Sequence, residues 1–143
     1  MDNLEELLLD VLSKAYSKII YSEEKILKDM IGDPLSLKEL HTLEVVFSAM
    51  NNKSNTASNI AKRLGITLGT CTTNIDRLIQ KGLVNKVKND TDRRIVYIEL
   101  TEQGKQVYLK HIGMHKKLVS KAISKLSTSE KVALMNAVNK LDI

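Results

Sequence analysis

The sequence predicts a mainly α-helical protein that carries one small β-hairpin. Apolar residues recur at three- and four-residue spacing over most of the 143 positions, which is the period of an amphipathic helix. Two short Val- and Ile-containing runs, 83–88 and 95–100, break that period and are joined by a polar loop, as in a hairpin. Only 3% of the residues are aromatic, so aliphatic side chains must build most of the core.

Length and composition narrow the class of protein further. The chain is long enough for one domain, and its formal net charge of +5 suits a polyanionic partner, although many proteins without such a partner carry as much. A single cysteine, Cys71, rules out an intrachain disulfide and suits a reducing compartment. We find neither a signal-peptide pattern nor a run of roughly 20 apolar residues, so we expect a cytoplasmic protein without a membrane span.

Start and stop signals divide the chain into its elements. Ser36 with Glu39 and Ser127 with Glu130 have the spacing of capping boxes, and Gly65 ends a short helix. We expect, in order, a long helix over 4–30, a helix from 36, short helices after the caps Thr56 and Thr67, strands over 83–88 and 95–100, a long helix from 101 that reaches Leu126, and a last helix from 127.

These elements predict one domain over 1–143 with two functional parts. A compact core is expected over 36–100, where the short helices and the hairpin meet. The terminal helices, 1–31 and 101–143, carry apolar stripes that nothing else in the chain is large enough to cover. Burial of these stripes against a second copy, in a two-fold dimer, is the simplest solution.

Two short helices separated by a tight turn and followed by a hairpin are typical of a winged helix-turn-helix. The second short helix of that motif presents its first turn to the major groove of DNA, and an Arg on the wing fits a narrow minor groove. Taken alone, a Thr-rich turn is more often a helix cap and an Arg pair is more often a solvated loop, but their order along this chain favours DNA. The candidate DNA-binding residues are Thr56, Thr67, Gly69, Thr70, Thr72, Thr73, Arg77, Lys81, Lys88, Arg93 and Arg94.

The run from Thr56 to Gly104 resembles the signature of the MarR family of transcription regulators. The shared pieces are Ala61-Lys62-Arg63-Leu64-Gly65, Gly82-Leu83-Val84, Asp90-Thr91-Asp92-Arg93-Arg94 and Leu100-Thr101-Glu102-Gln103-Gly104. The flanking helices are similar to the dimerisation helices of that family, so the resemblance spans nearly the whole chain. It implies a homodimeric repressor of a palindromic operator, a minor-groove Arg at position 93 or 94, and Asp92 as its charge partner. Leu68 departs from the more polar residue common in the family, which suggests one apolar base contact.

Within the family, runs 36–43 and 67–70 are similar to FabT-like repressors of fatty-acid synthesis genes, whose corepressor is acyl-loaded acyl carrier protein. A small-molecule-responsive repressor is the other reading. Because the first, second and fifth helices are aliphatic where an effector pocket is expected, the candidate pocket residues are Ile19, Leu40, Leu43, Ile112 and Val119. A basic rim would suit an acidic carrier, although solvated lysines are the simpler interpretation of Lys105, Lys110, Lys116 and Lys117.

The histidines leave a second alternative open. His111 and His115 are four residues apart, hence on one helical face at a spacing common among metal ligands. The resemblance to zinc-sensing members of the family implies a site made of Glu24, His41, His111 and His115. FabT-like proteins carry the same histidines without being known as metal sensors, and interior histidines often only form hydrogen bonds. Zinc is therefore the one cofactor that the sequence suggests, and it does so under this alternative alone.

Nothing in the sequence predicts an enzyme. There is no Gly-rich phosphate loop, nucleophile elbow or zinc-protease helix motif. The paired acids at 5–6 and 23–24 are interpreted as solvated helix surface, and Cys71 as a small buried hydrophobe. An interaction module that has lost DNA binding is the remaining rival class, and the basic wing argues against it.

Overall fold

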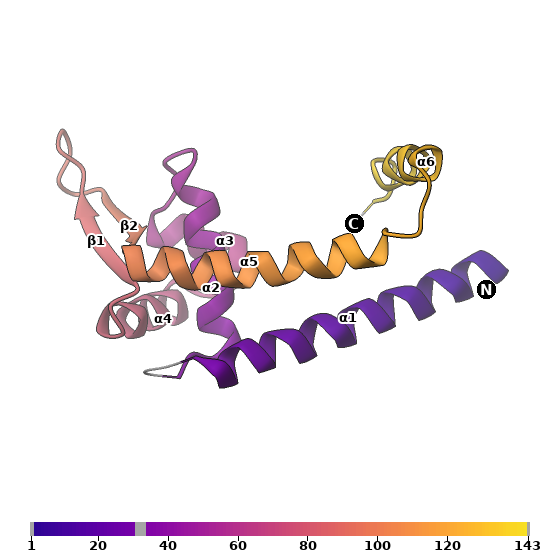
Figure 1. The fold of residues 1–143 in the computed structure, drawn as a ribbon. Helices are drawn as coiled ribbons and strands as arrows, with labels where there is room; N and C mark the ends of the chain where they lie inside the picture. The colour runs from indigo at the N-terminus through magenta and orange to yellow at the C-terminus, as the bar shows by residue number, and fades with distance from the viewer. Residues whose placement is uncertain (1, 31–33, 143) are drawn as a thin grey trace.

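The computed structural model describes residues 2–30 and 34–142. Within these residues the chain forms α1 (Asn3–Asp29), α2 (Leu37–Met50), α3 (Ala57–Leu64), α4 (Leu68–Gln80), β1 (Val84–Lys88), β2 (Val96–Leu100), α5 (Glu102–Ala122) and α6 (Thr128–Val138). Figure 1 shows α2, α3, α4 and the hairpin gathered at one end, with α1 and α5 extending from them and α6 lying at the far end. The predicted class, mainly helical with one hairpin, is confirmed.

Side-chain caps begin the helices, because the first N–H groups of a helix have no partner inside it. Ser36 accepts a hydrogen bond from the backbone N–H of Glu39, and the Glu39 carboxylate accepts one from the N–H of Ser36. The same reciprocal box opens α6 at Ser127 and Glu130, so both predicted capping boxes are confirmed. At the other end of α3, Gly65 adopts a left-handed conformation with φ of 67°.

Apart from a one-residue shift of α1, three element boundaries differ from those predicted. β1 begins at Val84, since the N–H of Leu83 still closes the end of α4 by donating to the Leu78 carbonyl. β2 begins at Val96, because Ile95 donates to the carbonyl of Asp92 within the loop. The fifth helix ends at Ala122, before the predicted Leu126, because the chain turns there ahead of the α6 cap.

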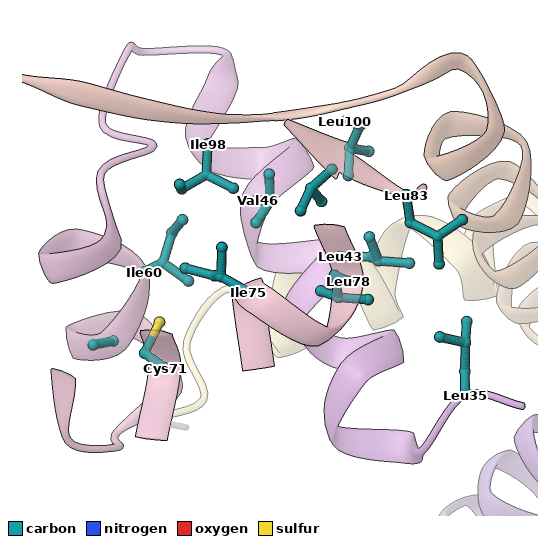
Figure 2. Close-up of a cluster of buried hydrophobic side chains, with 12 residues drawn as sticks. Leu35, Leu43, Val46, Ile60, Cys71, Ile75, Leu78, Leu83, Ile98 and Leu100 are labelled. Atoms are coloured by element: carbon teal, nitrogen blue, oxygen red, sulfur yellow. The ribbon is translucent and has the colours of Figure 1, made fainter. Parts of the chain in front are cut away.

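One hydrophobic cluster joins α2, α3, α4 and the hairpin (Figure 2). Leu43, Leu78 and Ile75 lie at its centre and are at most 1% exposed. The start of α5 docks on this cluster very closely: a Cβ on Gly104 would lie 2.0 Å from the carbonyl oxygen of Leu83. Further along α5, Tyr108 stacks on Phe47 of α2 with ring centroids 4.0 Å apart. The core therefore fixes α4 and the hairpin against α2 and the first turns of α5.

The outer parts of the chain have no such cover. Along α1, Leu4, Leu8 and Leu12 are 61%, 44% and 62% exposed, and α6 contains no buried residue. No helix within residues 2–30 and 34–142 is both long and apolar enough to cross a membrane.

Candidate nucleic-acid interface and buried histidine cluster

The first turn of α4 is a polar surface on a firmly anchored helix. Its inner face places Cys71, Ile75 and Leu78 in the core. Thr67 caps the helix by accepting from the N–H of Thr70 at 3.2 Å, and its hydroxyl also donates to the Thr70 hydroxyl at 2.9 Å. The turn thus combines free backbone N–H groups with hydroxyls, a combination that suits phosphate oxygens and base edges.

The rest of α4 extends this exposed surface. Leu68 is 51% exposed, and no atom of the described residues lies within 4 Å of the position that a Cβ on Gly69 would take, so a ligand backbone has room to approach. Thr72 and Thr73 donate their hydroxyls to carbonyls one turn earlier, which leaves their oxygens free to accept. Arg77 is exposed one turn beyond Thr73.

The wing holds an arginine in a fixed orientation. The Asp92 carboxylate accepts from Arg94 Nε at 3.0 Å and from Nη2 at 3.1 Å, and the backbone N–H of Arg94 donates to the same carboxylate. These bonds lower the pKa of Asp92 and raise the pKa of Arg94, so both groups stay charged at neutral pH. Asn89 shapes the loop by accepting from the N–H groups of Thr91 and Asp92. The sequence left either Arg93 or Arg94 as the charge partner of Asp92, and the structure pairs Asp92 with Arg94.

The remaining candidate DNA-binding residues lie in different settings. Arg93 and Lys88 are exposed on the wing. Thr56 is half-buried, where it caps α3 and forms an isolated bridge with Tyr97. Lys81 does not extend from the surface with the others: its Nζ donates to Glu39 Oε2 at 2.6 Å and to the carbonyl of Pro34 at 2.7 Å.

A second polar constellation lies between α1, α2 and α5, with Glu23 and His111 buried and His41 and His115 partly exposed. Glu23 Oε1 lies 3.2 Å from His41 Nε2, 2.9 Å from His111 Nε2 and 3.3 Å from His115 Nε2. The two α5 imidazoles also meet each other, with Nε2 atoms 2.7 Å apart. We call these four residues the Glu–His cluster.

The carboxylate of this cluster is strongly confined. The side chains of Glu23 and His111 are only 3% and 1% exposed, and the second oxygen of Glu23 is buried without a hydrogen-bond partner in the described residues. Burial acts to raise the pKa of Glu23, but hydrogen bonds and electrostatic attraction from His111 and His41 outweigh it, so the pKa lies below its ordinary value. A buried carboxylate ringed by imidazoles is a donor set that a cation would complete.

The predicted carboxylate of that site was wrong. Glu24 is exposed on α1, while Glu23 reaches the histidines. The helical period contains the missing signal, because Glu23 is four residues after Ile19 and three before Ile26, and these three therefore share the inward face. Residue type alone, by contrast, predicts solvated surface for its acidic side chain.

The candidate effector residues do not line one pocket. Leu40 and Leu43 are completely buried in the protein interior. Ile19 and Val119 line a groove of about 380 Å³ between α1 and α5, whereas Ile112 is half-buried and is not part of that lining. A wider groove of about 550 Å³ lies beside it on the same two helices, lined by these residues: Ser22, Ile26, Leu109, Lys110, Gly113, Met114, Lys117, Leu118 and Lys121. Of the proposed basic rim, Lys110 and Lys117 reach this groove.

Comparison with known proteins assigns the chain to a family. Residues 35–96 match the MarR family. The solved structure of Streptococcus pneumoniae FabT in complex with DNA is similar over 94% of this chain and 92% of that chain, with a TM-score of 0.76 and 29% sequence identity. The chain belongs to the MarR family.

Relatives of this MarR family protein include other bacterial regulators. The HTH-type transcriptional regulator YhbI of Bacillus subtilis is 29% identical over 80% of this chain and 73% of its own length. The transcriptional repressor MprA of Escherichia coli is 28% identical over 87% of this chain and 69% of its own length. This MarR family protein is therefore a transcriptional regulator of the winged helix-turn-helix type, and none of these relatives is named as an enzyme.

Proposed function

We propose that this MarR family protein is a homodimeric repressor that binds a palindromic operator in double-stranded DNA. The observation that carries the proposal is the exposed, Thr67-capped first turn of α4, whose opposite face is anchored in the core. The Arg94–Asp92 pair on the wing adds a positive group held in one orientation, suited to a minor groove. FabT, whose fold is similar to that of this chain, was itself solved with DNA.

Dimerisation is supported by the exposed stripes of α1 and α6. Leu4, Leu8 and Leu12 of α1 recur on one helix, and Met135 and Val138 of α6 are 57% and 49% exposed. Soluble monomers rarely expose contiguous apolar patches of more than a few hundred Å². In a two-fold dimer the two α4 helices would read half-sites about one helical turn of DNA apart.

The experiment that tests DNA binding first selects an operator from a random duplex pool and then measures its affinity by fluorescence anisotropy between 50 and 200 mM salt, a range of about fourfold over which phosphate contacts weaken binding strongly. We expect a palindromic consensus and an affinity that falls with salt. Failure of the wild-type protein to retain any duplex at the lowest salt would refute the proposal.

For the effector, we propose a long acyl chain presented by acyl carrier protein, acting as corepressor of fatty-acid synthesis genes. The resemblance to FabT supports this role, and so does the apolar groove between α1 and α5 with Lys110 and Lys117 on its wall. Addition of long-chain acyl carrier protein should tighten operator binding, whereas the unacylated carrier should not. Equal effects of the two carriers would exclude the acyl chain as the signal.

The Glu–His cluster favours metal-responsive control as the second candidate. Three imidazole nitrogens surround one oxygen of Glu23, and its other oxygen has no hydrogen-bond partner within residues 2–30 and 34–142, which fits the nitrogen and oxygen ligands of zinc. Calorimetry should then detect zinc binding, and zinc should alter operator affinity. His115→Ala should abolish both effects. Unchanged operator affinity with zinc and with a chelator would leave the cluster a hydrogen-bonded connection between helices.

A further inference from the structure

Lys81 and Glu39 connect the end of α4 to the start of α2. Lys81 follows the last residue of α4, and its Nζ lies 2.6 Å from Glu39 Oε2. The same ammonium donates to the carbonyl of Pro34 at 2.7 Å, in the segment that leads from α1 into α2. The side chains of Lys81 and Glu39 are only 20% and 5% exposed, so the pair is largely shielded from water.

The acceptor oxygen in this pair has a second structural task. Glu39 Oε2 also accepts from the backbone N–H of Ser36 at 3.1 Å, which completes the capping box of α2. The first turn of α2 and the last turn of α4 therefore share one carboxylate oxygen. Because breaking a shielded pair leaves an uncompensated charge, the three groups form a connection that resists displacement of either helix end.

This connection complements the apolar anchoring of α4. The core holds α4 through one face, with Cys71, Ile75 and Leu78. Apolar contacts are not directional and tolerate small rotations, whereas a hydrogen-bonded ion pair fixes a particular orientation. A tilt of α4 about its buried face would move the exposed Thr67 turn relative to any groove in which it sits.

We propose that Lys81 is a positioning residue for operator binding, which fixes the orientation of α4 through Glu39 and does not itself contact DNA. The inference rests on the proposed DNA-binding function. In this role Lys81 makes no phosphate contact. Loss of a positioning residue and loss of a phosphate contact change the salt dependence of operator affinity differently.

A phosphate contact releases counterions, so its removal lowers the slope of log affinity against log salt by about one. Loss of a positioning residue weakens binding while that slope stays the same. The test measures operator affinity between 50 and 300 mM salt, a range over which the slope is well determined. It compares wild type, Lys81→Met, Glu39→Gln, the double variant that carries both changes and, as the phosphate-contact control, Arg77→Gln.

We expect Lys81→Met to weaken operator binding about tenfold with an unchanged slope, as for loss of one partner of a shielded pair. Glu39→Gln should give a similar loss, although it removes a negative charge, because Gln keeps the capping box and loses the ion pair. The double variant should bind no more weakly than either single variant, since both disrupt the same connection. Arg77→Gln should lower the slope by about one.

Circular dichroism and sedimentation are measured on each variant to establish that it is folded, and Glu39→Gln keeps the test informative if Lys81→Met does not fold. A slope lowered by Lys81→Met as by Arg77→Gln would overturn the inference. So would wild-type affinity for Glu39→Gln. Both results require an operator that the wild-type protein binds, so they differ from failure of the proposed function, in which the wild-type protein binds no duplex.

Discussion

The guanidinium of Arg94 is held against the carboxylate of Asp92, with Nε and Nη2 each about 3 Å from a different oxygen. The side chain of Arg94 is 91% exposed, so this pair contributes little to the stability of the fold. Its effect is to restrict an otherwise flexible cation to one orientation at the end of the hairpin. Such restriction reduces the entropy that the side chain would lose on binding DNA.

Replacement of Arg94 by Ala should weaken operator binding about tenfold, as for a cation lost from a groove. The loss should be greatest for operators with A·T-rich flanks, where the minor groove is narrow. Asp92→Asn should cause a smaller loss, since the Arg remains but is less restricted. Equal affinities of the wild-type protein and Arg94→Ala in anisotropy titrations would exclude a wing contact.

Replacement of Thr73 by Ala should reduce discrimination more than affinity. Its hydroxyl donates to the carbonyl of Gly69, and its oxygen remains free to accept from a base edge on the exposed side of α4. A lost base contact costs about 1–3 kcal/mol of discrimination. Competition between the operator and a duplex with one altered half-site base measures this ratio, and an unchanged ratio would remove Thr73 from the reading surface.

A charge on the apolar stripe of α1 should separate the dimer. Leu8 is 44% exposed in the single chain, and Leu8→Glu would place an unpaired carboxylate in the proposed interface. Sedimentation should then show a monomer at micromolar concentration, with operator binding lost. Ser17→Glu, near the Asp10–Lys14 ion pair on the polar side of α1, is the control and should remain dimeric. A dimeric Leu8→Glu protein would place the interface elsewhere.

Two glycines of α5 should respond in opposite ways to substitution by Ala. At Gly104 the new Cβ would lie 2.0 Å from the Leu83 carbonyl oxygen, so α5 must move away from the chain segment between α4 and β1, at a cost of about 1–3 kcal/mol. At Gly113 the new Cβ would have no neighbour within 4 Å in the part of the chain that the structure describes, and the change should stabilise the helix by about 0.5–1 kcal/mol. Denaturant unfolding distinguishes the two, and a destabilised Gly113→Ala alongside a neutral Gly104→Ala would contradict the packing described.

The thiol of Cys71 should be unreactive in the folded protein. Burial raises its pKa above the ordinary value, so at pH 8 it is protonated to a greater extent than a free cysteine, and the thiolate is the reactive form. A thiol reagent should label the chain only after denaturation. Rapid labelling of the native protein would show that α4 opens readily from the core.

The interactions that the sequence predicted correctly are those between residues close in the chain. Capping boxes at Ser36 and Ser127 act across three residues, and the Gly65 stop acts within one turn. The hairpin strands pair across a short loop, with Val84 opposite Leu100. Local backbone requirements and hydrophobic period therefore suffice for the element order and the fold class, and with them for the position of the exposed α4 turn and the wing arginines.

Long-range packing decided the partners of the polar side chains. By residue type and position in the sequence, Lys81 is a candidate DNA contact. In the fold, however, α2 places Glu39 beside it, although the two residues are 42 positions apart in the chain. By residue type, Glu23 is expected on the solvated surface. In the fold, α5 places His111 against it, although the two residues are 88 positions apart in the chain. As aliphatic residues, Leu40 and Leu43 could line a pocket, but close packing of α2 in the interior leaves them no exposed area. The helices, the hairpin and the exposed α4 turn follow from the amino-acid sequence, because hydrogen bonds and periodicity act over a few residues. Which charged groups meet depends on how separate helices pack, so their pairing is a property of the folded chain.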